Sequence, residues 1–120
     1  YHRVGSFSTS SGYEMMNQPL NDNGKQLPTF LFAENDAIAI GALRALQEAD
    51  IAVPDQISIV GFNDSKVAKY VYPPLSSIRV DTREMGRTGV SLLLDRIAYP
   101  RKISKKISLS TEWIKRASTK

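Results

Sequence analysis

The sequence predicts an α/β fold in which helices cover a mostly parallel sheet. Short apolar segments rich in β-branched and aromatic residues alternate with segments whose apolar residues recur every three or four positions. This alternation is typical of parallel sheets, because each strand needs a crossover helix before the next one can run in the same direction. The expected order is roughly βαβαβαβαβ.

The first half of the chain contains the clearest helix signal. Residues 2–7 predict a short strand of mixed composition, and a helix is expected to start near Gly12 after a run of serine and threonine caps. Residues 29–33 are almost continuously apolar, which predicts a strand covered on both faces. Residues 37–50 predict a helix with two apolar stripes, so this helix needs more than one packing partner.

The middle of the chain repeats the pattern. Residues 57–61 predict a second buried strand, and residues 76–80 predict a third. Between them, residues 66–71 predict a short helix that Pro73 would end.

The last third contains a long helix and a final strand. Asp81 and Glu84 are three positions apart, as in a capping box, and predict a helix that runs to about Tyr99. Its apolar residues fall on one face. Residues 107–114 alternate in polarity and predict the closing strand.

Composition excludes several functional classes. The 120 residues include no cysteine, which excludes a disulfide scaffold, a thiolate zinc site and a cysteine nucleophile. The longest uncharged apolar run is far too short to span a membrane. The first residues do not form a signal peptide. Because the chain begins at Tyr1, we expect it to be part of a longer protein.

Positive charge is concentrated at the end of the chain. The formal net charge is +4, and residues 101–120 hold seven basic residues against one acidic residue, a balance of +6. A basic tail is a feature of nucleic-acid-binding proteins. A solvated final segment explains the same charge, and we favour that interpretation.

Three polar or aromatic positions lie at the ends of predicted strands. They are Phe7, residues 34–36 and residues 62–64. In open parallel sheets, ligands bind outside the carboxyl ends of the strands. Aromatic rings beside amides and carboxylates suit a polyhydroxylated ligand, because the ring covers a C–H face and the polar groups bind hydroxyls. Each residue also has a structural explanation: Asn35 and Asp36, like Asp64, could only cap helices, and Phe7 could be an ordinary buried ring.

Enzyme and metal hypotheses have weaker support. A lone His2 offers no Ser–His–Asp arrangement, and no glycine-rich phosphate motif follows a strand. Glu34, Asp36 and Asp64 could form an acidic magnesium cluster like that of a phospho-acceptor receiver domain. Such a domain also needs acidic residues after its first strand, where this chain has serines around Phe7.

The chain resembles the sensor domain of the lactose/galactose-repressor (LacI/GalR) family of bacterial transcription regulators. The resemblance covers essentially the whole chain, in order and with the family's spacing, and galactoside-operon repressors are most similar. It depends on residues 28–42 (PTFLFAENDAIAIGA), 57–64 (ISIVGFND), 73–79 (PPLSSIR), 84–87 (EMGR) and the ending 114–119 (IKRAST).

This resemblance implies a periplasmic-binding-protein-like fold of type I, of which the chain is a C-terminal fragment. Residues 1–80 would form the C-terminal lobe of the effector-binding domain, and residues 81–106 a crossing segment with a helix of the N-terminal lobe. Residues 107–120 would be the return strand and basic tail. Leu93, Leu94 and Ile97 should then pack on the other lobe, which this chain lacks, as it lacks the helix-turn-helix domain.

The resemblance also implies the ligand-binding residues. Asn35 matches the asparagine that binds sugar hydroxyls, and Phe7 matches an aromatic position beside the sugar. Asn63 stands where many members have aspartate, so the hydroxyl pattern recognised here could differ. Asp81 and Thr82 would lie near the cleft.

A homodimer surface is implied as well. It carries over onto Ile40, Leu43, Arg44, Gln47, Tyr70, Val71 and Tyr72. Read without the resemblance, Ile40, Leu43, Gln47, Tyr70 and Tyr72 suggest an amphipathic patch for self-association. The aliphatic residues of this set could equally belong to the core.

The implied function is allosteric control of operator binding in the cytoplasm by a small effector, expected to be a sugar. The effector would favour one angle between the lobes, and that angle would set the spacing of two DNA-reading domains in the dimer. No cofactor, membrane contact or catalytic step is expected. The alternative is a periplasmic sugar-binding protein of a transport system, which would be monomeric.

Overall fold

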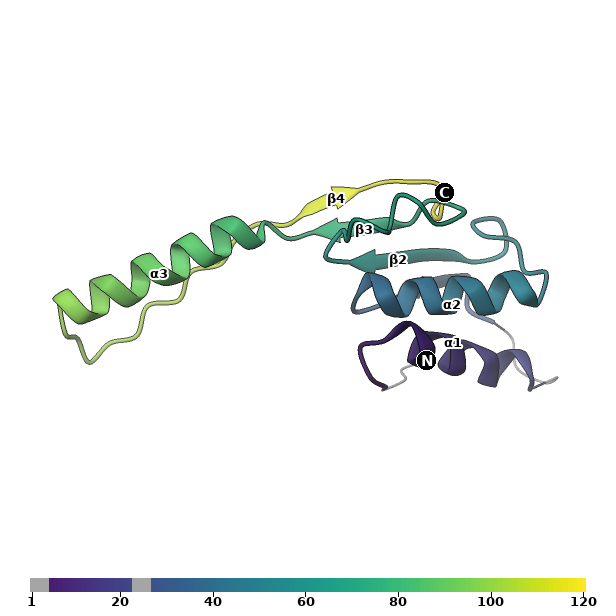
Figure 1. Ribbon diagram of the computed structural model, residues 1–120, viewed down its shortest axis with the longest axis horizontal. Coiled ribbons are helices and arrows are strands. Elements are labelled where there is room, and N and C mark those ends of the chain that lie inside the picture. Colours follow the sequence, from purple (N-terminus) through teal and green to yellow (C-terminus); the bar gives the residue numbers. More distant parts are fainter. Residues whose placement is uncertain (1–4, 23–26) are drawn as a thin grey trace.

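A computed structural model describes residues 5–22 and 27–120. Within these residues, one sheet has four strands in the order β1-β2-β3-β4 (Figure 1). The strands are β1 (Phe30–Phe32), β2 (Ser58–Phe62), β3 (Ser76–Arg79) and β4 (Glu112–Ile114). The first three are parallel and β4 is antiparallel to β3, so the prediction of a mostly parallel α/β sheet is confirmed.

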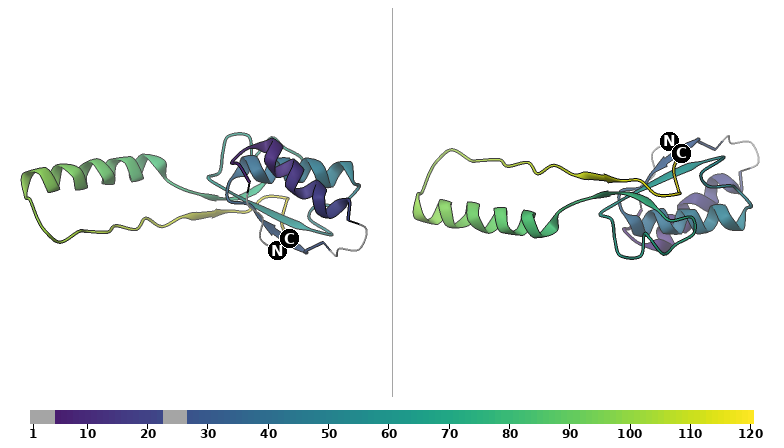
Figure 2. Two further views of the ribbon diagram at one scale, coloured as in Figure 1. Left: turned by 90° about the horizontal axis from the view of Figure 1, so that it is seen from below. Right: turned by 90° about the horizontal axis from the view of Figure 1, so that it is seen from above.

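The described helices are divided between a globular lobe and an arm. They are α1 (Thr9–Leu20), α2 (Asp36–Glu48) and α3 (Thr82–Ala98). We call residues 81–111 the arm and the other described residues the lobe. Figure 2 shows α3 projecting from the lobe, with the returning chain beside it. The Cα radius of gyration is 18.2 Å, whereas a compact chain of this length has about 14 Å.

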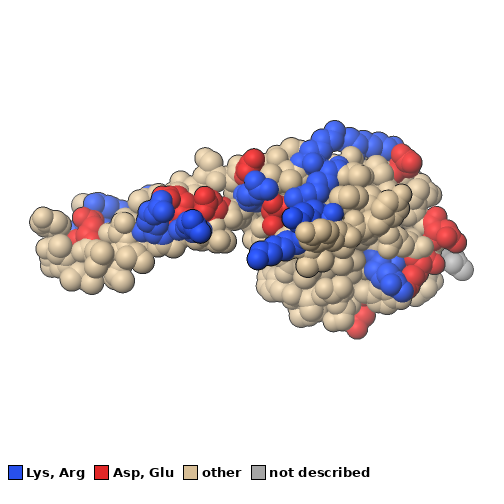
Figure 3. Space-filling model, turned by 45° about the horizontal axis from the view of Figure 1, so that its top comes forward, with Lys and Arg blue, Asp and Glu red and all other residues tan. Residues whose placement is uncertain are grey.

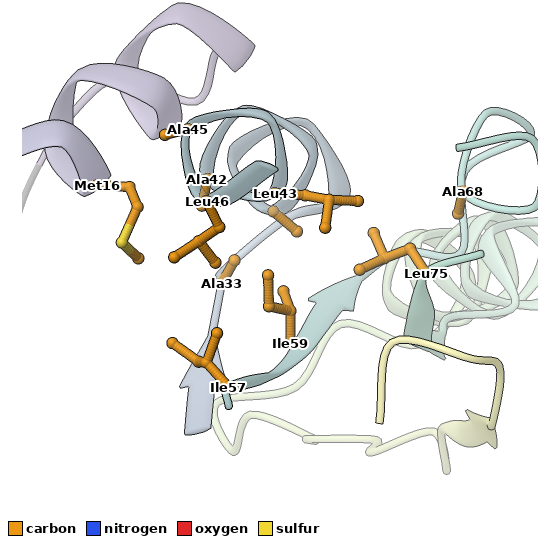
Figure 4. Close-up of a cluster of buried hydrophobic side chains, with 11 residues drawn as sticks. Met16, Ala33, Ala42, Leu43, Ala45, Leu46, Ile57, Ile59, Ala68 and Leu75 are labelled. Atoms are coloured by element: carbon orange, nitrogen blue, oxygen red, sulfur yellow. The ribbon is translucent and has the colours of Figure 1, made fainter. Parts of the chain in front are cut away.

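The core of the lobe lies between α2 and the sheet. Leu43 and Leu46 point from α2 toward Ile57 and Ile59, and all four side chains are fully buried (Figure 4). Met16 of α1 joins this cluster from the far side of α2. The helix therefore packs against both the sheet and α1, as its two apolar stripes predict.

Two glycines let α1 and α2 approach closely. A Cβ on Gly41 would lie 1.9 Å from the carbonyl oxygen of Thr9, and a Cβ on Gly12 would lie 2.2 Å from that of Ile38. Real Cβ atoms do not tolerate such distances from backbone atoms, so glycine is required at both positions for this contact.

The opposite face of the sheet is more open than the sequence predicts. Phe30 and Phe32 are about half exposed, because α1 and α2 both lie on the other side. Phe32 meets Phe62 edge to face, with ring centroids 6.5 Å apart. The expectation that β1 is covered on both faces is thus not met by the described residues.

Among the described residues, no helix is both long enough and apolar enough to cross a membrane.

Three predicted elements differ in the structure. Residues 5–7 are not in a strand, because Ser8 starts α1 by accepting a hydrogen bond from the Ser11 N–H; the rest of that predicted strand lies outside the described residues. Residues 66–71 form successive turns rather than a helix, since six residues are too few for a stable isolated helix. The last strand pairs only over Glu112–Ile114, because its neighbour β3 ends at Arg79.

The arm has no core of its own. Asp81 caps α3 by accepting a hydrogen bond of 2.9 Å from the Glu84 N–H, which confirms the predicted helix start. Yet no residue of α3 is buried, and the apolar side chains of Leu93, Leu94 and Ile97 are each more than half exposed.

Candidate ligand-binding site

The three predicted ligand-binding segments lie at one edge of the lobe, and the sheet places two of them. Because β1 and β2 are parallel neighbours, the segments that follow them lie side by side. Figure 1 shows that the start of α1, the start of α2 and the end of β2 all lie at the edge that faces the arm. Phe7, Asn35 and Asn63 belong to these three segments.

Asn35 is both a helix cap and available for a ligand. Its Oδ1 accepts a hydrogen bond of 2.8 Å from the Ile38 N–H, so it is the N-cap of α2. That bond uses one side of the amide, and Nδ2 donates no hydrogen bond within the described part of the chain. The structural and ligand-binding explanations are therefore compatible, because the cap fixes the orientation in which the amide nitrogen is offered.

Asn63 occupies a backbone conformation that most residues avoid. Its φ is 92° and that of Asp64 is 49°, so two consecutive residues are in the left-handed region. The Asn63 N–H donates to the carbonyl oxygen of Ile78, which ties this turn to β3. The side chain of Asn63 is exposed at the end of β2.

Phe7 is not a core residue. Its side chain is 70% exposed, in a bend just before α1. The alternative of an ordinary buried ring is therefore wrong, and the ring is free to cover one face of a ligand.

The two neighbouring carboxylates are already occupied. Asp36 is 2% exposed and accepts hydrogen bonds from the hydroxyl of Ser77 and the N–H of Ser65. Asp64 forms ion pairs with Arg116 at 2.6 Å and Arg79 at 2.7 Å. Burial acts to raise the pKa of Asp64, but the hydrogen bonds and charges of the two arginines outweigh it and hold the pKa below its usual range.

This arrangement overturns the magnesium-cluster hypothesis. Asp36 and Asp64 serve internal contacts, and in the described ranges no three or more His, Cys, Asp or Glu side chains converge in a way that could hold a metal ion. Asp64 does not cap a helix either, because the segment after it consists of turns.

Asp81 lies at the junction of lobe and arm. Its carboxylate is occupied as the cap of α3 and is exposed. A shallow, open depression of about 620 Å³ surrounds it, with Thr82 in its lining. The depression is lined by residues 79–83 and 110–112.

Six of the seven residues of the predicted dimer surface are at least partly exposed. Tyr70 and Tyr72 are 77% and 82% exposed, and Gln47 donates a hydrogen bond to the carbonyl oxygen of Tyr72, which joins the two segments. Ile40 and Val71 are half-buried, and Arg44 is exposed in an ion pair with Glu48. Leu43, however, is buried in the core, because it lies on the side of α2 that faces the sheet.

Part of the positive charge at the end of the chain is paired with acidic neighbours. Of its seven basic residues, four form ion pairs: Arg101, Lys105, Arg116 and Lys120. Figure 3 shows the blue side chains on this face close to red ones. These pairs favour a solvated final segment over a nucleic-acid contact.

Several residues that organise this edge carry no signal in the sequence. Ser77, Arg79 and Arg116 all contact the strand-end carboxylates. Arg116 is 52 positions from Asp64 and Ser77 is 41 positions from Asp36. No local feature distinguishes Ser77 from other strand residues or Arg116 from other basic residues of the tail.

Comparison with known proteins identifies the class to which this fold belongs. Residues 1–119 match the family described as periplasmic binding protein-like domain. The HTH-type transcriptional regulator GalR of Streptococcus thermophilus is 50% identical over 117 residues, which are 98% of this chain and 35% of that protein. The chain therefore spans about a third of the length of this relative.

Solved structures agree with the sequence match. A LacI family transcriptional regulator from Enterococcus faecium with bound ribose has a TM-score of 0.78 at 35% identity, over 95% of this chain and 41% of that one. The Lac repressor dimer bound to operator and the anti-inducer ONPF has a TM-score of 0.86 at 33% identity, over 96% of this chain and 39% of that one. Within the periplasmic binding protein-like family, this chain belongs to the LacI/GalR group.

Proposed function

We propose that this chain supplies one wall of a sugar-effector site and part of the dimer surface of a DNA-binding transcription repressor. The observation that carries the proposal is the placement of Asn35 and Asn63 after adjacent parallel strands, at the edge where α1 starts directly after the exposed Phe7. Two amides that both donate and accept, beside an aromatic face, form a suitable surface for a polyhydroxylated molecule.

The exposed face of the arm is evidence that another part of the protein provides a second wall of the effector site. Leu93, Leu94 and Ile97 form an apolar stripe that is exposed in this chain. Such a stripe on a helix needs a partner. We assign residues 81–106 to the other lobe of the effector-binding domain, so that the effector binds between two lobes, with Asp81 at the crossing.

Control of DNA binding follows from the same arrangement. An effector that binds one angle between the lobes more tightly than another shifts the population toward that angle, by at most its difference in binding free energy. In a homodimer formed through the Tyr70 and Tyr72 surface, that shift changes the spacing of two helix-turn-helix domains that lie outside this chain and contact operator DNA. The expected location is the cytoplasm, where operator DNA is found.

Periplasmic transport is not favoured as an alternative. The relative and the two structures described above are named as regulators or repressors, and the GalR protein is similar over nearly the whole chain. These relatives are regulators rather than enzymes, and no catalytic step is proposed for this chain.

The test is Asn35→Ser in the full-length protein. Serine caps helices about as well as asparagine, so the free energy of unfolding should change by less than about 0.5 kcal/mol while the amide nitrogen is lost. Calorimetric titration with galactose, lactose, melibiose, raffinose and ribose should show an affinity at least about tenfold lower, which corresponds to about 1.4 kcal/mol, for each sugar that the wild type binds.

The matched control is Asn21→Ser. Asn21 is an exposed asparagine at the C-terminal end of α1, whereas the candidate site lies near the start of that helix. It should leave sugar affinity unchanged. If Asn35→Ser binds as tightly as the wild type, the assigned site is wrong. If the wild type binds none of these sugars, the sugar-effector proposal fails.

A further inference from the structure

A buried cluster of hydrogen bonds joins the two segments that carry the asparagines. The Ser77 hydroxyl donates to Asp36 Oδ1 at 2.6 Å and accepts from the Asp64 N–H at 3.0 Å. Asp36 Oδ2 accepts a further bond from the Ser65 N–H. The cluster therefore connects the residue after Asn35 with the two residues after Asn63.

The two side chains at the centre of this cluster are shielded from solvent. Ser77 is 0% exposed and Asp36 is 2% exposed. Burying a carboxylate is costly unless each oxygen is hydrogen-bonded, and here both oxygens are. Removal of Ser77 therefore leaves the buried Asp36 carboxylate without one of its two bonds, and also leaves the partly buried Asp64 N–H without its acceptor.

Gly61 provides the space that the cluster needs. A Cβ on Gly61 would lie 2.2 Å from Asp36 Oδ1 and 3.2 Å from Asp36 Cα. Rotating the carboxylate could relieve the first contact but not the second, which involves backbone. The absent side chain in β2 thus lets the start of α2 lie directly against this strand.

The bonds act where the backbone is least favourable. Asn63 and Asp64 both have positive φ values, a conformation that Asn and Asp adopt more readily than other non-glycine residues and that hydrogen bonds from the surroundings stabilise. The N–H groups of Asp64 and Ser65 are fixed by Ser77 and Asp36. The direction in which Asn63 leaves β2 is therefore fixed by this cluster together with the bond from the Asn63 N–H to the Ile78 carbonyl oxygen.

We propose that Ser77, acting through Asp36 and the Asp64 N–H, is a positioning residue that sets the placement of Asn63 relative to Asn35 and so selects which sugar epimer binds. Ser77 does not itself contact the sugar. The inference rests on the proposed sugar-effector function.

The structure offers a matched control for this proposal. Ser118 is also 0% exposed; its hydroxyl donates to the Ile59 carbonyl oxygen at 2.6 Å and accepts from the Ser76 N–H at 2.8 Å. Ser77→Ala and Ser118→Ala each remove one donated and one accepted bond from a buried serine. Their effects on the free energy of unfolding should be similar, while their effects on binding should differ.

The experiment is calorimetric titration of the full-length variants with galactose and its epimer glucose. Ser77→Ala should weaken binding of the preferred epimer at least fivefold and reduce the ratio of the two affinities, whereas Ser118→Ala should retain the wild-type ratio. Ser77→Thr keeps the hydroxyl and should retain the ratio as well. If Ser77→Ala does not fold, the nearly isosteric Asp36→Asn, which replaces one acceptor oxygen with a donor, should show the same reduced ratio.

The outcomes separate this inference from the function on which it rests. If Asn35→Ser lowers affinity but the Ser77 and Asp36 variants keep the wild-type ratio, the positioning role is overturned and the sugar site stands. If the wild type binds neither epimer, the inference is overturned together with this choice of effector. If the ratio of the two affinities falls in Ser77→Ala but not in Ser118→Ala, the positioning role of Ser77 is supported.

Discussion

Helices α2 and α3 have similar local sequence features but opposite surroundings. Each begins with a side-chain cap, Asn35 in one case and Asp81 in the other, and each carries apolar residues at helical spacing. Seven residues of α2 are buried, whereas none of α3 is. The comparison teaches that apolar periodicity predicts a contact face, but does not show whether this chain supplies the contact.

The difference agrees with the share of the relatives that the chain covers. The chain matches 35% of the GalR protein, and α3 is the described helix without a core around it. We assign its apolar stripe to a lobe outside this chain. The contrast between α2 and α3 should therefore disappear in the full-length protein, where both helices would have a packed apolar face.

The largest expected effect comes from Leu46→Ala compared with Leu94→Ala. Leu46 is fully buried, and its truncation should lower the free energy of unfolding by about 2–5 kcal/mol. Leu94 is 59% exposed, so in the 120-residue chain its truncation should cost less than about 0.5 kcal/mol. Urea unfolding of both variants measures the contrast.

The same two substitutions in the full-length protein test the assignment of the arm. If the stripe on α3 packs against the other lobe, Leu94→Ala should there cost an amount typical of a buried leucine, about 2–5 kcal/mol. A Leu94 variant that is as stable as the wild type in the full-length protein would contradict the assignment of the arm.

Much of the lobe could be predicted from sequence because its signals are local. The helix predicted over residues 37–50 is α2 with ends shifted by one or two residues, and the strands predicted at 57–61 and 76–80 are β2 and β3. Their caps, glycines and β-branched runs lie within the elements themselves. Residues 5–7 and 66–71 differ because a serine cap and short-range turns competed with weak propensities.

The candidate site was only partly predictable for a different reason. Asn35 and Asn63 could be identified as candidates because each follows a predicted strand, and Phe7 because it ends one, although residues 5–7 form no strand in the structure. Ser77 and Arg116 could not, since their partners are 41 and 52 positions away and only the folded sheet brings them together.

Glycines give the next contrast between the two helices. Gly41→Ala places a methyl group 1.9 Å from the Thr9 carbonyl oxygen, and such overpacking should cost about 1–3 kcal/mol. A Cβ on Gly89 of α3 would meet no atom within 4 Å, so Gly89→Ala should stabilise the 120-residue chain by about 0.5–1 kcal/mol. Thermal and urea unfolding would test both signs, and a stabilising Gly41→Ala would show that α1 and α2 do not cross as described.

The smallest expected contrast involves two carboxylates, each paired with two cations. The Asp64 side chain is 7% exposed, between Arg116 and Arg79, whereas the Asp95 side chain is 35% exposed, between Arg101 and Lys105. The hydrogen bond from Lys105 lowers the pKa of Asp95, and burial opposes it only in part. The pKa of Asp64 is lowered against a larger effect of burial.

Both carboxylates should therefore stabilise the fold in the same pH range. A carboxyl group whose folded pKa lies below its unfolded value of about 3.9 contributes its full stabilisation above that pH and loses it as the pH falls through the folded pKa. Asp64→Asn should lower stability at neutral pH and reduce the loss of stability below about pH 4. Asp95→Asn should have a smaller effect that decreases further with added salt, because exposed ion pairs are screened more than buried ones. Urea unfolding from neutral to acid pH at low and high salt tests this order, and an equal or larger, salt-insensitive effect at Asp95 would show that the arm is as well shielded from solvent as the lobe.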